Sequence, residues 1–411
     1  MAQIFPFQPF RYSEKAGPLG LVVTQPYDKI SGEMRTRYLA QSPYNLVRVI
    51  LGERYDSDTE TDNVYTRAAR YLEEWIGQGI LAQEQEPSLY AYFQEFQVPD
   101  TGETVVRKGF VGLGALEDYS AGVVHRHEQT LSGPKKDRLE LLRHTHAHFG
   151  QIFMLYPDPA GEIDALLEES AQIPPLGAVT DEYGAVHRFW KIADTARIER
   201  IRQCMAPKKL LIADGHHRYE TALAFRNENP GLAGADKTMM TFVNMHSPGL
   251  RILATHRLVH SMEDFVPAAF LAKAAAHFRV EEIGGPDMLR RAWRDSTNTV
   301  IGAASGERLY LLEWLGAPGE LDVRVLHDVL LSRVLGIGEE AVREERNLRY
   351  VRGLEAALEA AREGQAQIAF LLKATSIQQV AEISFAGGVM PQKSTDFYPK
   401  LLSGLTVYRL A

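Results

Sequence analysis

The chain has 411 residues, which is enough for two or three domains of ordinary size. Hydrophobic residues make up 45% and charged residues 24%, as in a soluble globular protein, and the formal net charge of −8 disfavours a general role in binding nucleic acid. Because the sequence has one cysteine, Cys204, no signal-peptide pattern and no apolar run near the ~20 residues of a membrane span, we expect a cytoplasmic protein that binds neither nucleic acid nor a membrane.

The first segment, residues 1–87, is predicted to mix turns and helices. The stretch QPYDKIS (25–31) predicts a loop that leads into a helix over residues 32–41. Apolar residues from Tyr65 to Trp75 recur at spacings of three or four, so residues 63–79 are predicted to form an amphipathic helix.

The second segment, residues 88–260, is predicted to be the catalytic or nucleotide-binding domain. It opens with two β-rich runs around PDTG (99–102), which predict a hairpin. Predicted helices then alternate with predicted strands, the strands being 151–156, 185–192, 209–213, 239–245 and 250–259. This alternation predicts an α+β fold, a mixed sheet with helices packed on it.

The third segment, residues 261–411, is predicted to be a C-terminal α/β domain. Its patterns predict helices over 264–278, 323–337 and 353–364, and strands over 298–305, 308–315 and 366–374. The tail from 387 to 410 is rich in Gly, Pro, Lys, Ser and Thr, yet too apolar for a disordered segment, so we expect an ordered loop.

The junction at LIADGHHRYE (211–220) joins a predicted buried strand to a predicted helix. A helix N-terminus carries free N–H groups and a partial positive charge, so it binds anions. Gly215 permits an unusual φ and lets a ligand approach the backbone. The sequence therefore predicts a phosphate site at this corner.

Four titratable residues surround Gly215. Arg218 is expected to make a bidentate phosphate contact, and His216 and His217 to donate hydrogen bonds or move protons. Asp214 suits a Mg²⁺ ligand beside a phosphate. The alternative is that Asp214 caps the helix and the histidines lie on the surface. No Walker loop is present to offer a different phosphate site.

A second constellation, HRHEQT (125–130), is expected to complete the site. Glu128 is the candidate general base, beside His127, and Thr130 is a candidate phosphate contact. A zinc site on these histidines is the alternative. The nearby histidines of 144–148 are spaced by two and do not share a helix face, so a polar helix end is the simpler interpretation.

The chain as a whole resembles a bacterial and archaeal family, the domain of unknown function numbered one thousand and fifteen. The resemblance rests on QPYDKIS, SPYNLVRVI, HRHEQT, GQIFMLY, ADGHHRYETAL, VNMHSPGLRILATHRLV and MPQKSTDFYPKLLSGL. The histidine-rich RHTHAHFG stretch departs from the family pattern, which is a further reason not to place a metal there.

The middle segment also resembles the fold shared by sulfiredoxin, the partition protein ParB and the archaeal free-serine kinase. The kinase has an H-E-Q segment and a D-G-H-H-R segment in this order, as this chain does at 127–129 and 214–218. The resemblance implies that Glu128 is the catalytic carboxylate and that Asp214 to Arg218 form the phosphate and metal loop. Sulfiredoxin chemistry needs a cysteine at the corner, where this chain has histidine.

The leading hypothesis from these residues is an enzyme, a phosphotransferase acting on a small hydroxylated metabolite, with serine first by resemblance. Mg²⁺ and a phosphoryl donor such as ATP, ADP, CTP or pyrophosphate would be its cofactors. A phosphate-ester hydrolase at the same site and a nucleotide-binding regulatory protein without turnover are the alternatives. The oligomeric state stays open.

Basic and hydroxylated side chains elsewhere are candidate substrate contacts, each weighed against an ordinary ion pair or packing role. A substrate carboxylate would need an arginine or lysine, and the polar stretch PQKSTDFYPK (391–400) could reach a phosphate. The candidates are Lys135, Arg138, Arg257, Lys393, Ser394, Thr395 and Lys400.

Overall fold

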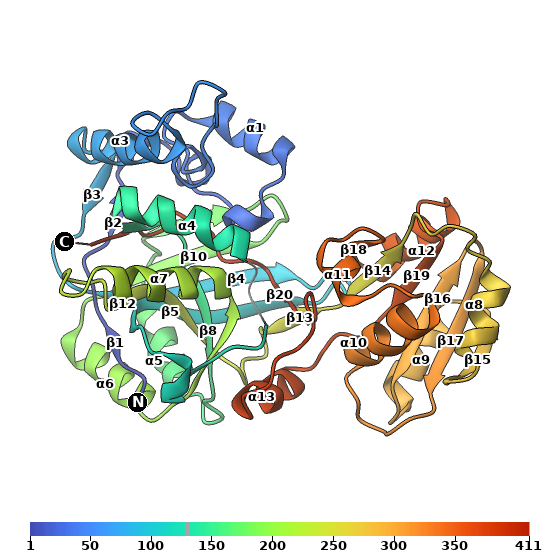
Figure 1. Ribbon diagram of the computed structural model, residues 1–411. Helices are drawn as coiled ribbons and strands as arrows, with labels where there is room; N and C mark the ends of the chain where they lie inside the picture. Colours follow the sequence, from blue (N-terminus) through green and yellow to red (C-terminus); the bar gives the residue numbers. More distant parts are fainter. Residues whose placement is uncertain (129–131, 411) are drawn as a thin grey trace. The chain divides into compact units, whose positions relative to one another are not determined.

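The computed structural model describes residues 1–128 and 132–410, so Thr130 lies outside the described residues. The chain divides into two compact units (Figure 1). Unit 1 comprises Met1–Val98, Glu103–Leu250 and Pro399–Ala411, and unit 2 comprises Pro99–Gly102 and Arg251–Tyr398. The boundary expected near residue 87 falls inside unit 1, because the first strand of the chain is hydrogen-bonded into the same sheet as the central segment.

Unit 1 is built on a mixed sheet in the order β6-β11-β8-β12-β5-β4-β10-β9, with β1 paired to β5. β6 runs parallel to β11 and β12 parallel to β8, whereas the other neighbours are antiparallel. The predicted α+β class and the predicted hairpin are thereby confirmed. The strands are β1 (Ile4–Phe5), β4 (Leu89–Gln97), β5 (Thr104–Ala115), β6 (Val124–His125), β8 (Ile152–Tyr156), β9 (Gly177–Thr180), β10 (Val186–Ile192), β11 (Leu210–Asp214) and β12 (Lys237–Asn244).

Three helices of unit 1, α1, α3 and α6, begin at a residue whose side chain caps the first turn. α3 starts after Asn63, whose side chain accepts from the backbone N–H groups of Tyr65 and Thr66 in a capping box, and it buries Leu72 and Trp75 as the predicted spacing required. α4 and α7 lie side by side (Figure 1). The helices are α1 (Gly32–Gln41), α2 (Val47–Ile50), α3 (Val64–Gly77), α4 (Ser132–Thr145), α5 (Glu162–Ser170), α6 (Thr195–Met205) and α7 (His216–Glu228).

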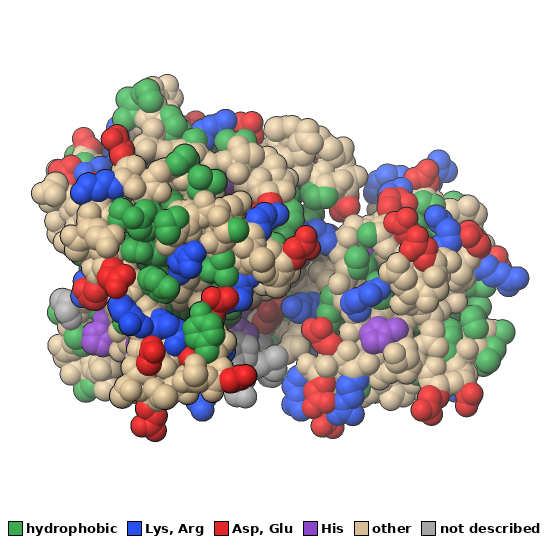
Figure 2. Space-filling model, turned by 90° about the horizontal axis from the view of Figure 1, so that it is seen from above, with side chains coloured by type: hydrophobic (Ala, Val, Ile, Leu, Met, Phe, Trp, Pro, Cys, Tyr) green, Lys and Arg blue, Asp and Glu red, His purple; other side chains and the backbone are tan. Residues whose placement is uncertain are grey.

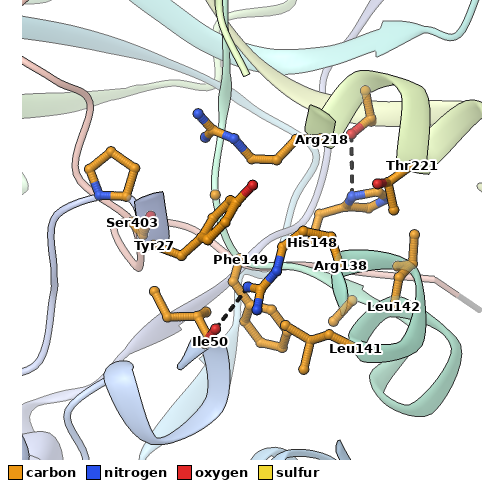
Figure 3. Close-up of a pocket in the computed structure, with 14 residues that line it drawn as sticks. Tyr27, Ile50, Arg138, Leu141, Leu142, His148, Phe149, Arg218, Thr221 and Ser403 are labelled. Atoms are coloured by element: carbon orange, nitrogen blue, oxygen red, sulfur yellow. Dashed lines mark hydrogen bonds between the residues drawn. The ribbon is translucent and has the colours of Figure 1, made fainter. Parts of the chain in front are cut away.

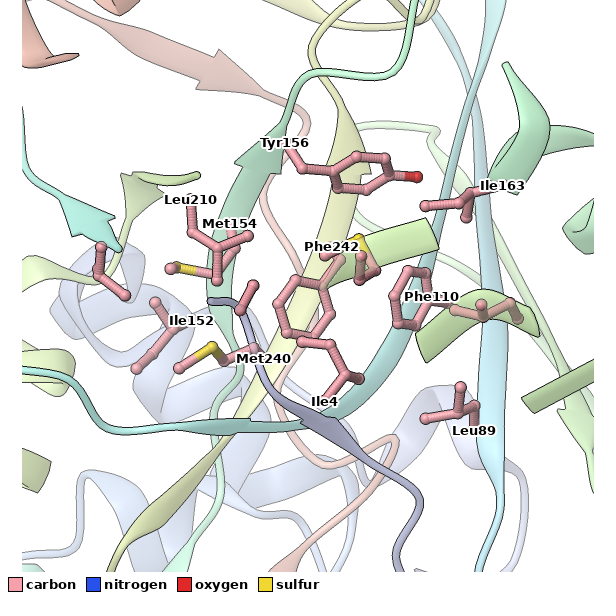
Figure 4. Close-up of a cluster of buried hydrophobic side chains, with 14 of the residues drawn as sticks. Ile4, Leu89, Phe110, Ile152, Met154, Tyr156, Ile163, Leu210, Met240 and Phe242 are labelled. Atoms are coloured by element: carbon pink, nitrogen blue, oxygen red, sulfur yellow. The ribbon is translucent and has the colours of Figure 1, made fainter. Parts of the chain in front are cut away.

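The main apolar core of unit 1 lies against the sheet and is shown in Figure 4. Phe110 of β5 stacks on Phe242 of β12 with ring centroids 5.0 Å apart, and Met154 of β8 belongs to the same cluster. α5, α6 and α7 each contribute side chains to this cluster, as Ile163, Ile201 and Ala222 illustrate. The strand ends that carry polar residues are therefore held by a continuous packed core.

The C-terminal residues return to unit 1 and form an ordered segment, as the sequence predicted for the tail. The backbone N–H groups of Thr24 and Phe10 donate to the carbonyls of Ser403 and Val407 at 3.1 and 2.9 Å. β21 (Tyr408–Arg409) then pairs with β7 (Ala147–His148). Lys400 is thus fixed within unit 1, although the chain reaches it directly from unit 2.

Unit 2 has its own antiparallel sheet in the order β15-β17-β16-β19-β14-β18, with an apolar cluster that includes Leu289 and Ala357. β13 (Arg251–Leu253) pairs with β20 (Asp396–Tyr398) in a separate two-stranded sheet. The sheet strands are β14 (Thr255–Val259), β15 (Phe278–Ile283), β16 (Val300–Ser305), β17 (Arg308–Trp314), β18 (Leu348–Arg352) and β19 (Ile368–Leu371). The helices are α8 (Pro267–Ala274), α9 (Pro286–Asp295), α10 (Asp322–Val325), which runs into a π-helix over Leu326–Val334, α11 (Glu339–Arg343), α12 (Leu354–Arg362) and α13 (Ile377–Phe385).

On the face shown in Figure 2, Lys and Arg side chains are interspersed with Asp and Glu side chains. Within the described parts of the chain, none of the helices has both the length and the apolar character that a membrane crossing requires.

Candidate functional site

Two sequence motifs meet at one end of the unit 1 sheet. β6 and β11 are neighbouring parallel strands, with His125 opposite Leu211. Because parallel strands end at the same edge, the residues that follow β6 lie beside the residues that end β11. His127 is thereby brought to Ile212, two residues before Asp214, although the two motifs are more than eighty residues apart in sequence.

His127 makes the direct contacts between the motifs. Its Nδ1 lies 2.8 Å from the carbonyl oxygen of Ile212, so Nδ1 carries the proton and donates it. The backbone N–H of His127 donates to Nε2 of His216 at 3.4 Å, and the two imidazole rings pack edge to face with centroids 4.6 Å apart. The predicted second half of the site is therefore in contact with the predicted corner.

The histidines at this junction are neutral at physiological pH. Burial lowers the pKa of His127 to about 4, and burial together with the neighbouring His127 lowers the pKa of His216 further below its ordinary value. His217 is partly buried, and this burial also lowers its pKa. None of these rings contributes a positive charge for an anion at pH 7, so a contact with phosphate would be a neutral hydrogen bond.

The turn between β11 and α7 has the backbone geometry expected of an anion site. Gly215 is the N-cap of α7 and has φ of 97°, a left-handed conformation that favours glycine. It supplies no side-chain hydrogen bond to the first turn. The amides at the start of α7 therefore face the corner without a capping side chain.

Asp214, the last residue of β11, lies between two cations. Lys400 Nζ donates to its Oδ1 at 3.1 Å and Arg218 Nη2 donates to its Oδ2 at 2.6 Å. Burial alone would raise the pKa of Asp214, but the charges of Lys400, Arg218 and Lys29 outweigh this effect and hold the pKa well below its ordinary value. Asp214 is therefore ionised, and Lys400 is the substrate candidate that pairs with it.

Glu128 lies at the open side of the junction. Its Oε1 is 3.9 Å from Nε2 of His127, and its side chain keeps 27% of its surface exposed. Lys135, a predicted substrate contact, pairs with Glu220 of α7, and Arg126 pairs with the same carboxylate at 3.4 Å. The carboxylate of Glu128, the candidate base, is thus reachable from solvent. Lys135 forms an ion pair within the protein, which was the alternative to a substrate contact for this residue.

A cavity of about 60 Å³ lies next to Arg218 (Figure 3). Arg138, another substrate candidate, lines it, stacks over Tyr27 at 4.2 Å and donates to the carbonyl of Ile50 at 2.8 Å. Thr221 of α7 also lines it, and its buried hydroxyl has no hydrogen-bond partner among the described residues. The cavity therefore combines apolar walls with an unsatisfied polar group.

The donor set at Asp214 does not fit a resident Mg²⁺. Both carboxylate oxygens are taken by the cationic groups of Lys400 and Arg218, and a divalent ion there would meet strong repulsion. Nowhere in the described residues do three or more His, Cys, Asp or Glu side chains gather as a metal group requires.

His144 stacks on Tyr65, whereas His148 stacks on Tyr408, so the histidines near the end of α4 serve packing.

The other substrate candidates belong to unit 2, where they form a cluster of their own. Arg257 is buried and its Nη2 donates to the carbonyl of Lys393 at 3.0 Å. Ser394 Oγ donates to the carbonyl of Pro391 at 2.5 Å, and Thr395 follows it just before β20. These contacts hold the loop before β20 in shape.

Sequence reasoning missed several residues that shape the corner. Lys29, in the QPYDKIS stretch, lowers the pKa of Asp214 from a distant part of the chain. Arg107 and Gln94, on β5 and β4, bind the backbone carbonyls of Pro399 and Lys400. Nothing in their spacing marks these residues, because their contacts depend on the order of strands in the sheet.

Residues 4–329 match the family described as a protein of unknown function, DUF1015, and the chain belongs to this family. No curated protein matches the chain. A free serine kinase in complex with AMP is 15% identical over 69% of this chain and 89% of that one, with a TM-score of 0.39. A conserved hypothetical protein from Pyrococcus furiosus is 14% identical, covering 67% and 87%, with a TM-score of 0.35. The Staphylococcus aureus protein SbnI, truncated at its C-terminus, is 10% identical, covering 72% and 87%, with a TM-score of 0.35.

Proposed function

We propose that the protein is a phosphotransferase that moves a phosphoryl group from a nucleotide or another polyphosphate to a small hydroxylated metabolite. The observation that supports this proposal is the contact of His127 with Ile212 and His216, because the carboxylate of Glu128 lies 3.9 Å from Nε2 of the same His127. Serine is the first acceptor to test, because the two motifs resemble those of the free-serine kinase.

The groups around Asp214 and Gly215 include the cationic side chains and backbone N–H donors that bind a polyphosphate. The charges of three cationic side chains, Lys400, Arg218 and Lys29, act on the carboxylate of Asp214 and could also attract a phosphate. The start of α7 adds backbone donors beside them. Asp214 fixes the directions of Lys400 and Arg218, and any Mg²⁺ would enter bound to the phosphates of the donor, as part of the substrate.

Glu128 is suited to accept the proton of the acceptor hydroxyl. In the transfer step the acceptor oxygen forms a bond to phosphorus, the bridging P–O bond of the donor breaks, and the hydroxyl proton moves to the Glu128 carboxylate. His127 is neutral, and its Nε2, 3.9 Å from Oε1 of Glu128, carries no proton because the ring proton on Nδ1 is donated to Ile212. The cavity beside Arg218, with Thr221 in its wall, is the candidate acceptor pocket.

The test is Glu128→Gln, which keeps the shape of the side chain and removes its basicity. We expect turnover to fall at least ~100-fold while nucleotide affinity stays within about threefold. Glu14→Gln, at an exposed position in the first turn of a short 3-10 helix, is the matched control and should change neither quantity. Loss of nucleotide affinity in Glu128→Gln, together with no turnover by the wild type, would point to a binding protein.

A further inference from the structure

The ammonium group of Lys400 stands where a metal ion would bind Asp214. It lies 3.1 Å from Oδ1, its side chain is 9% exposed, and Arg218 holds the other oxygen. A buried lysine this close to a carboxylate is a fixed cation rather than a mobile surface charge.

The backbone at Lys400 is held by a buried arginine and a buried glutamine. Arg107 is 1% exposed, and its Nη2 donates to the carbonyl of Pro399 at 2.5 Å. Its Nε donates to Oε1 of Gln94 at 3.0 Å, and Nε2 of Gln94 donates to the carbonyl of Lys400 at 2.9 Å. Two consecutive carbonyls are thus bound to one side-chain pair, so the backbone of Lys400 cannot move away without breaking buried hydrogen bonds.

A second chain of hydrogen bonds holds the residues that follow. The backbone N–H of Leu402 donates to the hydroxyl of Tyr92 at 3.4 Å, and that hydroxyl lies 2.6 Å from Nδ1 of His187. Nε2 of His187 lies 3.2 Å from Oδ2 of Asp181. Because the ionised Asp181 can only accept, Nε2–H of His187 donates to it, and Nδ1 of the neutral ring accepts from the Tyr92 hydroxyl.

We infer that Lys400 occupies the place of a divalent cation at Asp214, so that the corner offers a protein cation to an anionic ligand and binds no resident metal. Gln94 and Arg107 act as positioning residues for Lys400. The inference rests on the proposed function in taking the ligand to be a polyphosphate, but its tests need no turnover.

The first test measures binding of Mn²⁺ alone by electron paramagnetic resonance. Wild type and Lys400→Arg should bind Mn²⁺ weakly, whereas Lys400→Met should bind it at least tenfold more tightly because the carboxylate has lost a cation. The double variant Lys400→Met/Asp214→Asn should lose that gain. Tight Mn²⁺ binding by the wild type that Asp214→Asn removes would overturn the inference, and so would a Lys400→Met variant without the gain.

The second test measures binding of inorganic pyrophosphate by calorimetry with a chelator present. Wild type should bind it without metal, Lys400→Met at least tenfold more weakly, and Lys400→Arg within about threefold of wild type. Gln94→Met should weaken binding severalfold, whereas Gln97→Met, at the exposed end of β4, should not. Equal affinities for wild type, Lys400→Met and Gln94→Met would overturn the inference. If the protein binds pyrophosphate in this way but transfers no phosphoryl group, the result would support the inference about Lys400 and contradict the proposed function.

Discussion

His127 and His216 pack edge to face with ring centroids 4.6 Å apart, although 89 residues separate them in sequence. This contact closes the junction between β6 and the start of α7, and it does so with two uncharged rings. The pair therefore makes the junction sensitive to acid, because protonation would place charge in a buried contact.

The pH dependence of stability should report on His127. Its pKa is about 4 in the folded protein and ~6.5 in the unfolded chain, so between these values the unfolded chain binds more protons and stability falls as the pH falls. We expect the wild type to lose about 2 kcal/mol more than His127→Gln between pH 7.5 and pH 5, as measured by urea unfolding. His246→Gln, at an exposed position, should behave as wild type. Equal losses in wild type and His127→Gln would contradict this account.

Gly215→Ala should destabilise the protein by about 1–2 kcal/mol, since φ of 97° is unfavourable for a residue with a Cβ. The added methyl would also meet the guanidinium of Arg218 at 3.1 Å, so pyrophosphate affinity should fall as well. Gly32→Ala, at the start of α1 with nothing within 4 Å, should be neutral or slightly stabilising. Urea unfolding of both variants checks the prediction. Equal free energies of unfolding for Gly215→Ala and Gly32→Ala would contradict the claim that the turn at Gly215 requires glycine.

Tyr92→Phe should cost about 1–3 kcal/mol, because it removes the hydroxyl that joins Leu402 to His187. Tyr156→Phe is the matched control, since its hydroxyl is equally buried and has no hydrogen-bond partner among the described residues. The control should change the free energy of unfolding by no more than ~0.5 kcal/mol. A similar loss in both variants would show that hydroxyl removal, not the link to Leu402, sets the cost.

Thr221→Val should leave stability unchanged or raise it slightly, because the buried hydroxyl has no hydrogen-bond partner in the described structure. If the cavity takes the acceptor, the KM for the acceptor should rise severalfold with kcat little changed. Thr145→Val is the contrast, since its hydroxyl donates to the carbonyl of Leu141 at 2.7 Å and its loss should cost ~1 kcal/mol without altering KM. An unchanged KM in Thr221→Val would place the acceptor elsewhere.

Local patterns in the sequence predicted much of unit 1. The helix over 63–79 follows from apolar spacing and is α3, and the glycine turn at Asp214–Gly215 follows from a buried strand before a helix. The helices α5 and α9, of nine and ten residues, were not predicted, although α1 and α12 of the same lengths were. The Ser376–Gln379 capping box was a usable signal for α13 that the sequence reasoning did not use.

The rest of the site depends on tertiary structure. The pairing of β6 with β11 brings His127 to Ile212 and His216, and no local pattern specifies which strands become neighbours. Lys400 was a candidate because of its polar surroundings, but its ion pair with Asp214 depends on the return of the chain to unit 1. The buried charge of Arg107 has no periodic signature, since an arginine in a strand is ordinarily exposed.

The most direct measurement is incubation of the wild-type protein with Mg²⁺, serine and each of ATP, ADP and pyrophosphate, followed by mass spectrometry of the acceptor. We predict serine carrying one phosphoryl group with at least one donor, and at least ~100-fold less product with Glu128→Gln. A panel of other small hydroxylated metabolites extends the same assay. Nucleotide binding without any phosphorylated acceptor, or release of phosphate that no acceptor affects, would contradict the proposed phosphotransferase.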